Sequence, residues 1–207
     1  MTEALISVFV TLFVVIDPIG VAPLFMSLTP TETAVERRKL ALKGIGIGAA
    51  ILFVFGIYGE ILLETLGIGM PAFRIAGGIL LVLLSIDMLM ARDSGLRNTT
   101  DDEAAEGTKQ ADISVFPLAI PLVAGPGAMT SIVLLMGKAE GDRAMQGAIL
   151  GTTAIVLLLS LLCLLAASTL MKMLGVTGVN VITRVFGIIT AALGVQFVID
   201  GVLVVLS

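Results

Sequence analysis

The chain has 207 residues, of which 57% are hydrophobic and 14% are charged, with a formal net charge of −4. Soluble domains are about half apolar and about a quarter charged, so this apolar excess is too large for a globular core and indicates a membrane protein. The negative charge excludes a nucleic-acid partner. With no histidine and one cysteine, the chain also lacks the soft ligands of a zinc or copper site, so we expect no metal and no cofactor.

Six segments are long and apolar enough to cross a bilayer, which takes about 20 mostly apolar residues. In chain order they cover residues 4–28, 42–64, 71–91, 113–137, 146–170 and 181–205. Between the first two, Thr29, Pro30 and Glu32 predict a capping box that starts the second helix near Pro30. The predicted fold class is an all-α membrane protein with six transmembrane helices.

Basic residues predict the orientation, because they concentrate on the cytoplasmic side of a membrane. The connections after the second and fourth segments hold only two basic residues, Lys138 and Arg143. The connections after the first, third and fifth segments hold Arg37, Arg38, Lys39, Lys43, Arg92, Arg97, Lys109 and Lys172. The N-terminus lacks the basic region and cleavage site of a signal peptide. We therefore expect a multi-pass protein of the bacterial or archaeal inner membrane, with both termini external.

The first and fourth segments each contain helix-breaking residues where a helix is otherwise expected. The first reads "VVIDPIGVAPLF" (residues 14–25) and the fourth "AIPLVAGPGAMTS" (residues 119–131). Proline removes a backbone donor and disturbs the preceding turn, and freed backbone groups are tolerated in a membrane only where they line a protein cavity. One kinked helix would favour a packing role, but two such boxes at equivalent places favour a site. We predict that helices 1 and 4 are broken.

Each break offers free N–H groups at a new helix N-terminus and free carbonyls at the end of the preceding helix. This pair of ends suits the carboxylate and the ammonium of one small zwitterionic solute. The expected substrate-binding residues are Asp17, Pro18, Ile19, Gly20, Val21, Ala22 and Pro23 in the first segment and Gly125, Pro126, Gly127, Ala128, Thr130 and Ser131 in the fourth.

Asp17 has the strongest individual case, because a charge at the bilayer centre costs ~2.5–3.5 kcal/mol and is functional by default. It is expected either to hold the substrate ammonium or to carry a coupling proton. Arg74 and Arg184 are weaker candidates, expected to reach toward opposite membrane faces rather than to contact substrate. Two roles are left open for Gln196: it either forms an interhelical hydrogen bond or lines a pore. Close helix packing is expected at Gly44, Gly46, Gly48, Gly56 and Gly59.

A weak internal repeat links the two halves of the chain. The third segment contains "FRIAGGI" (73–79) and the sixth contains "TRVFGII" (183–189). We expect a first three-helix repeat over residues 1–91, an acidic cytoplasmic loop over 92–112 and a second repeat over 113–207. Because three spans are an odd number, the halves would cross the membrane in opposite senses, which is the inverted-repeat plan of many secondary transporters.

Four stretches resemble the MarC family of integral membrane proteins: "VIDPIGVAPLFMSLT", "PAFRIAGGILLVLLSIDML", "FPLAIPLVAGPGAMTSIVLL" and "GVQFVIDGVL". The resemblance extends over all six segments. Members of that family are described as transporters of small neutral amino acids, glycine and alanine among them, and the family is grouped with amino acid exporters of the LysE type. The resemblance implies a six-helix transporter with broken first and fourth helices at the substrate site, and it implies no direction of transport.

The leading hypothesis is a secondary transporter for small neutral amino acids, coupled to protons, rather than an enzyme. Its expected partners are a small zwitterionic solute and the lipid bilayer. One alternative is an exporter of another small metabolite, and a second is a non-transporting membrane scaffold. The physiological substrate, the direction, the coupling ion and the oligomeric state, including a homo-oligomer, are left open.

Overall fold

The computed structural model describes residues 2–90 and 112–206, and every regular element in this part of the chain is helical. The elements are α1 (Thr2–Ile16), α2 (Pro18–Leu28), α3 (Ala34–Thr65), α4 (Met70–Met90), η1 (Ser114–Val123), α6 (Pro126–Lys138), α7 (Arg143–Leu165) and α8 (Ala167–Leu206). The expected all-α fold is confirmed.

The helices supply the membrane spans that the apolar segments predict. Five stretches of the described chain are long and apolar enough to cross a bilayer: Thr2–Leu28, Ala34–Thr65, Met70–Met90, Arg143–Leu165 and Ala167–Leu206. A sixth is formed by η1 and α6, which are bent by 54° at the break between them. The architecture is therefore that of a multi-pass membrane protein.

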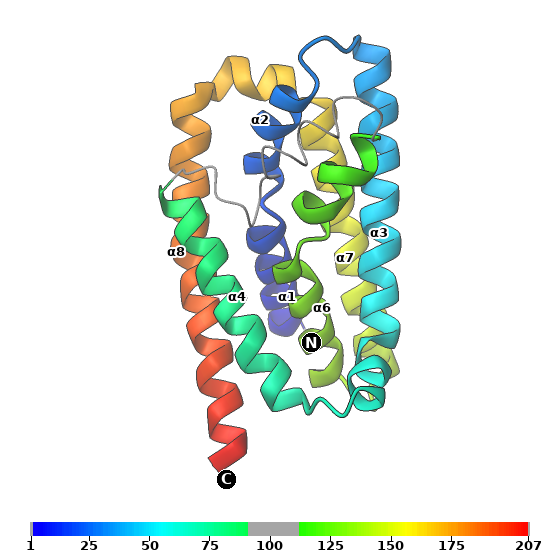
Figure 1. Ribbon diagram of the computed structural model, residues 1–207, viewed down its shortest axis with the longest axis vertical. Helices are drawn as coiled ribbons and strands as arrows, with labels where there is room; N and C mark the ends of the chain where they lie inside the picture. Colours follow the sequence, from blue (N-terminus) through cyan, green and yellow to red (C-terminus); the bar gives the residue numbers. More distant parts are fainter. Residues whose placement is uncertain (1, 91–111, 207) are drawn as a thin grey trace.

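The helices run up and down the long axis of the bundle, and both termini lie at the same end (Figure 1). Helix α3 packs against η1 and α6, whereas α7 packs against α1 and α2. Helix α2 also contacts α8, and α6 contacts α4. The two broken spans thus lie inside the bundle, each covered by a straight helix from the other half of the chain.

The most extensive helix pair is α4 with α8, which run in opposite directions along one side of the bundle (Figure 1). Gly187 lies against Met88 near the end of α4, and Gly201 lies against the first turn of α4. Midway, a methyl group built on Gly78 would lie 2.5 Å from the carbonyl oxygen of Gly194. Glycine at these positions lets the two backbones touch, as small residues do at membrane helix interfaces.

The second long helix starts later than the sequence suggests. Helix α3 begins at Ala34, with Thr33 as its N-cap. The capping box is formed by Thr33 and Glu36, whose carboxylate accepts a hydrogen bond from the Thr33 N–H at 2.8 Å. Thr29 instead ends α2, where its hydroxyl donates to the Phe25 carbonyl at 2.8 Å. The prediction at Thr29 and Glu32 was wrong because the same residue spacing recurs four residues further on.

Helix α8 is longer than the sixth predicted segment and is bent at Gly175. This glycine has φ 64° and ψ 173°, a conformation that only glycine adopts readily. The residues before it run across the end of the bundle, and the rest of α8 then descends along α4 (Figure 1). A short helical segment across the end of the bundle therefore replaces the expected connection between the fifth and sixth spans.

The predicted orientation can be tested with cysteines placed on the two ends of the bundle. In a Cys163→Ala background, we expect Glu140→Cys, on the end that holds the termini, to react with a membrane-impermeant maleimide in intact cells. Thr31→Cys, between α2 and α3, should react only after lysis. Both positions are exposed, so labelling reports sidedness. The reverse pattern would place the termini inside the cell.

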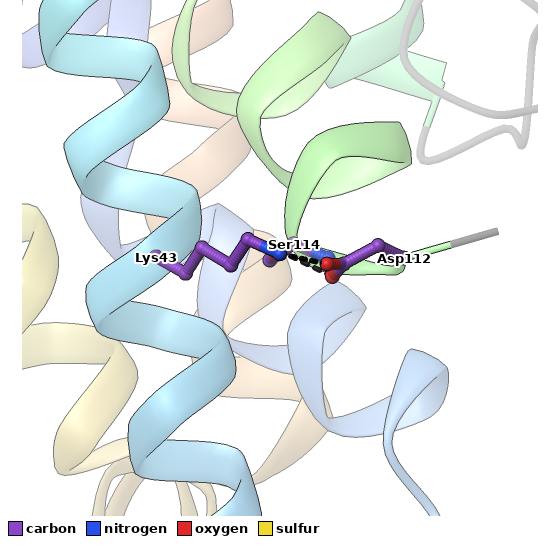
Figure 2. A network of polar contacts seen from close by, with 3 residues as sticks. All are labelled: Lys43, Asp112 and Ser114. Carbon is purple, nitrogen blue, oxygen red and sulfur yellow. Dashed lines mark hydrogen bonds and ion pairs between the residues drawn. The ribbon is translucent and has the colours of Figure 1, made fainter.

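Most of the expected loop over 92–112 lies outside the described residues, but its last residue, Asp112, organises the start of η1. One Asp112 carboxylate oxygen accepts a hydrogen bond from the Ser114 N–H at 3.1 Å, and its carbonyl accepts one from the Val115 N–H at 2.8 Å. Figure 2 shows the Ser114 hydroxyl and the Lys43 ammonium meeting the same carboxylate. Asp112 therefore links the fourth span to α3.

These contacts predict a pH-dependent contribution to stability. The hydrogen bond from Lys43, followed by that from Ser114, lowers the pKa of Asp112 from 3.8 to about 2. Because the folded-state pKa is lowered, the contribution is complete above about pH 4 and is lost as pH falls toward 2. The pair is partly exposed, so Asp112→Asn should cost less than about 1 kcal/mol at pH 7. Thermal unfolding of both proteins at pH 7 and pH 3 checks this, and a difference that grows at pH 3 would contradict it.

Candidate functional site

The first span is broken at Asp17, as predicted. This residue joins α1 to α2 in the left-handed conformation, with φ 49° and ψ 65°, which aspartate tolerates better than most residues. Its carboxylate accepts a hydrogen bond from the Gly20 N–H at 3.0 Å and so caps α2. Pro18 at the first position of α2 has no N–H to satisfy. Asp17 is fully buried, so the break lies in the protein interior, away from lipid.

Gly20 faces both the capping carboxylate and helix α8. A methyl group built on Gly20 would lie 2.0 Å from Oδ2 of Asp17 and 2.7 Å from the hydroxyl oxygen of Thr183. No rotation of a flexible chain end relieves both contacts, since the carboxylate is fixed by its bond to the Gly20 N–H. The absence of a side chain at Gly20 therefore leaves room for the Asp17 carboxylate and for Thr183 of α8.

The fourth span is broken over a longer stretch. Phe116 and Ile120 have extended backbones inside η1, with φ and ψ of −133° and 126°, and −128° and 124°. Each precedes a proline, which disfavours the helical conformation of the residue before it. Gly125 is the N-cap of α6 and provides no side-chain hydrogen bond to the first turn. In contrast to α2, helix α6 therefore begins without a side-chain cap inside the bundle.

A small cavity lies at this second break. Its volume is about 20 Å³, and it is lined by Val15, Leu80, Leu84, Pro121, Leu122, Val123, Gly125, Pro126, Gly127 and Ala128. The lining includes both the last residues of η1 and the first turn of α6. A cavity of this size holds about one water molecule. The end of η1 and the start of α6 thus border one small cavity, which is too small in this conformation for an amino acid.

The structure brings only some of the predicted site residues together. Gly125, Pro126, Gly127 and Ala128 line the cavity, whereas none of residues 17–23 does. From the first span only Val15, two residues before the break, reaches it. The sequence therefore predicts two neighbouring breaks correctly, but the predicted single binding surface is divided between them.

The two hydroxyl candidates of α6 lie outside the cavity lining. A methyl group on Gly77 of α4 would lie 1.8 Å from the methyl carbon of Thr130, so Thr130 fits against a glycine of α4. Ser131 is fully buried, and its hydroxyl has no hydrogen-bond partner among the described residues. Ser131 is therefore the better candidate for a polar contact that this conformation leaves unused.

The lower-ranked polar residues lie away from the cavity. Arg74 is partly buried near the start of α4, and its Nε has no hydrogen-bond partner within the described ranges. Arg184 is exposed on α8. Gln196 is exposed, and its amide donates to Asp200 on the same helix at 2.6 Å. Within the described residues, Gln196 therefore forms a hydrogen bond inside α8 and none to another helix.

Sequence reasoning missed Thr183, Leu80 and Leu84, which approach the breaks from the third and sixth spans. Leu80 and Leu84 follow the motif "FRIAGGI", and Thr183 begins "TRVFGII". The recurrence of the motif was a usable signal that these helices contact the site. Apolar residues in an apolar helix give no further indication of which face they occupy.

Comparisons with known proteins agree with this architecture. The model of the MarC family, described as MarC family integral membrane protein, matches residues 2–206. A UPF0056 membrane protein of Methanocaldococcus jannaschii is 36% identical over 198 residues, covering 94% of this chain and 93% of the relative. YvbG of Bacillus subtilis, also a UPF0056 membrane protein, is 35% identical over 198 residues, covering 96% and 93%.

The similarity extends to a third organism. YhcE of Escherichia coli, another UPF0056 membrane protein, is 35% identical over 197 residues, covering 94% of this chain and 89% of the relative. No solved structure is significantly similar. Because the family model and the relatives match nearly the whole chain, including both helix breaks, this protein belongs to the MarC family of integral membrane proteins.

Proposed function

We propose that this protein is a secondary transporter of small neutral amino acids such as glycine and alanine, with proton coupling through Asp17, in the inner membrane of a prokaryotic cell. The observation that carries the proposal is the break of the fourth span. There the last residues of η1 and the first residues of α6, a helix without a side-chain cap, line the same cavity. Such a pair of ends offers acceptors for an ammonium group and donors for a carboxylate.

The size of the cavity favours small solutes. With a volume of about 20 Å³, it must widen before an amino acid enters. Its walls are glycine, proline, alanine and branched apolar side chains, so little room is left for a substrate side chain. We interpret this conformation as a closed state of the site, between the states open to either side of the membrane.

The pattern of helix contacts supports alternating access between two equivalent halves. Helix α3 covers the broken span η1–α6, and α7 covers the broken span α1–α2. Likewise α2 contacts α8, α6 contacts α4, and α4 contacts α8 in antiparallel fashion. Exchanging the two halves leaves these particular contacts unchanged, which supports an inverted repeat, although α1 contacts α8 more extensively than η1 contacts α4. In the proposed cycle one repeat rocks against the other and exposes the cavity to each side in turn.

Transport in proteoliposomes tests the function directly. The purified protein should exchange labelled glycine or alanine against the unlabelled amino acid, and a proton gradient should drive accumulation. Glycine should also stabilise the folded protein, by about 2.7 kcal/mol at a concentration 100 times its dissociation constant. If the protein exchanges a different metabolite but neither glycine nor alanine, the result identifies an exporter of another small solute. If no solute of a broad panel is exchanged, and none stabilises the protein, the result favours a non-transporting membrane scaffold.

Gly127→Val tests whether the cavity is the substrate site. A side chain here would point at Leu81 and Leu84 of α4 and at Val15, with the first methyl group 2.9–3.3 Å from their side-chain carbons. These are flexible chain ends, so we expect the variant to fold but to lose at least tenfold in glycine affinity as the cavity fills. Gly147→Val serves as the control, because nothing lies within 4 Å of that position. Unchanged glycine affinity in Gly127→Val would show that the break is a packing kink.

A further inference from the structure

A second pocket, of about 280 Å³, lies where α2, α3, α7 and α8 meet. It is at the end of the bundle opposite the termini, where α2 leads into α3 and α7 into α8 (Figure 1). Its polar lining consists of Arg37, Arg38 and Ser168, and its apolar lining includes Met26, Leu164 and Leu165. Among the described residues no carboxylate lines this pocket, so its described lining is positively charged and suits an anion.

The two arginines differ in how they are held. Arg37 is partly buried, and its Nε donates to the Thr29 carbonyl at 3.1 Å while Nη1 contacts the sulfur of Met26 at 3.6 Å. Arg38 is exposed and makes no hydrogen bond or ion pair with any described residue. Both arginines line the pocket, and their guanidinium groups supply several planar donors, which match the oxygens of a phosphate group.

The pocket continues into an apolar surface. On α7, Ile155, Leu158, Leu162 and Leu165 are 54%, 56%, 52% and 43% exposed. Their spacing places them on one face of the helix, and Leu165 itself lines the pocket. The surface therefore offers a charged site at one end and a continuous path for a hydrocarbon chain leading away from it toward the middle of the span.

The neighbouring part of α8 places the pocket at the membrane boundary. The residues before Gly175 run across the bundle end (Figure 1), and Met173 and Val176 are 78% and 62% exposed. Lys172, which immediately precedes Met173, is also exposed. A segment that lies across a bundle with exposed apolar and basic residues is typical of a helix at the lipid head-group level. The pocket is thus at the depth of lipid phosphates.

We propose that this pocket binds an anionic phospholipid, with Arg37 and Arg38 on its phosphate and one acyl chain along the exposed face of α7. The positive charge of this end and the expected cytoplasmic location favour such lipids, which give that leaflet its negative surface potential. A bound lipid would fasten α2 and α3 to α7 and α8, and so would join the two halves of the chain at their boundary.

The test measures lipid binding to the purified full-length protein by native mass spectrometry, with thermal unfolding as a second readout. Phosphatidylglycerol should bind and stabilise more strongly than phosphatidylcholine. Loss of one guanidinium, in Arg38→Gln, should weaken phosphatidylglycerol binding about fivefold, the equivalent of about 1 kcal/mol for one basic residue near a membrane surface. Arg38→Gln is decisive because it breaks no described bond of the folded protein, whereas Arg37→Gln also loses the bond to Thr29.

Two controls separate the site from general attraction. Lys39 is an exposed cation on the same helix that does not line the pocket, so Lys39→Gln should retain phosphatidylglycerol binding. Glycerol phosphate, which has the head group without acyl chains, should stabilise the protein little. An equal loss in Lys39→Gln, unchanged binding in Arg38→Gln, or equal stabilisation by glycerol phosphate would each overturn the proposal, the last in favour of a soluble anion.

Discussion

Replacing Gly194 by valine is expected to prevent assembly of the native bundle. A single methyl group at this position would already lie 2.7 Å from the carbonyl oxygen of Gly78 and 2.9 Å from the backbone nitrogen of Val82. Both neighbours are backbone atoms of α4, so no side-chain rotation relieves the overlap, and the two helices must separate. Overpacking in a well-packed core lowers the free energy of unfolding by about 1–3 kcal/mol. Because valine here would meet backbone atoms, its cost should reach or exceed the upper end of that range.

The matched control is Gly151→Ala on α7, where nothing lies within 4 Å of the added carbon. Replacing glycine by alanine inside a helix stabilises it by up to about 1 kcal/mol when space is available. Thermal unfolding and the fraction of monodisperse protein in detergent would be measured for both variants. If Gly194→Val unfolds at the temperature of the wild type, the close α4–α8 contact is not a determinant of the fold.

The glycines of α3 show how far periodicity alone could have predicted the packing. All five glycines of α3 were expected at helix contacts, and four of them lie against the fourth span. A methyl group at Gly48 would lie 2.7 Å from Val123, and one at Gly59 would lie 2.5 Å from Val133. A methyl group built on Gly46 would meet no described atom of another element within 4 Å. Gly46 is off the helical face that Gly44, Gly48, Gly56 and Gly59 share, so applying the helical period would have excluded it.

The positions of the breaks could be predicted because proline and glycine act locally. Pro18 and Pro126 each occupy the first position of a new helix, as their chemistry favours. The composition of the cavity could not be predicted in the same way, because Val15 and Leu84 are indistinguishable in sequence from residues that face lipid. Which apolar side chains line a cavity depends on the rotation of each helix in the bundle, and a uniformly apolar helix carries no periodic signal for that rotation.

The role of Asp17 also depends on information that the sequence lacks. A buried carboxylate in a membrane span predicts function, but the structure adds a structural task, since the carboxylate caps α2 through the Gly20 N–H at 3.0 Å. Capping and proton transfer use the same side chain. They can be separated because asparagine also accepts this hydrogen bond and also tolerates the left-handed backbone, whereas alanine does neither.

We therefore expect a large loss of proton-driven accumulation in Asp17→Asn, and Asp17→Ala is the variant with which it is compared. Asparagine should keep the cap and the fold, so the variant should still exchange glycine or alanine across liposomes. It carries no titratable proton, so accumulation driven by a proton gradient should fall to background. Alanine should lose about 1–2 kcal/mol of stability through the missing cap, whatever its effect on transport. Exchange and proton-driven uptake, measured side by side with thermal unfolding, give the comparison.

The outcome in Asp17→Asn distinguishes three roles for the carboxylate. We favour the proton carrier, because the carbonyl end of η1 at the cavity can already accept from a substrate ammonium, and Asp17 does not line that cavity. If Asp17 instead held the ammonium as a fixed anion, the variant would bind substrate more weakly at every pH and would lose exchange as well. If exchange and driven uptake both stay at wild-type rates, the charge is dispensable, and the cap on the Gly20 N–H, which asparagine retains, is the whole function of this residue.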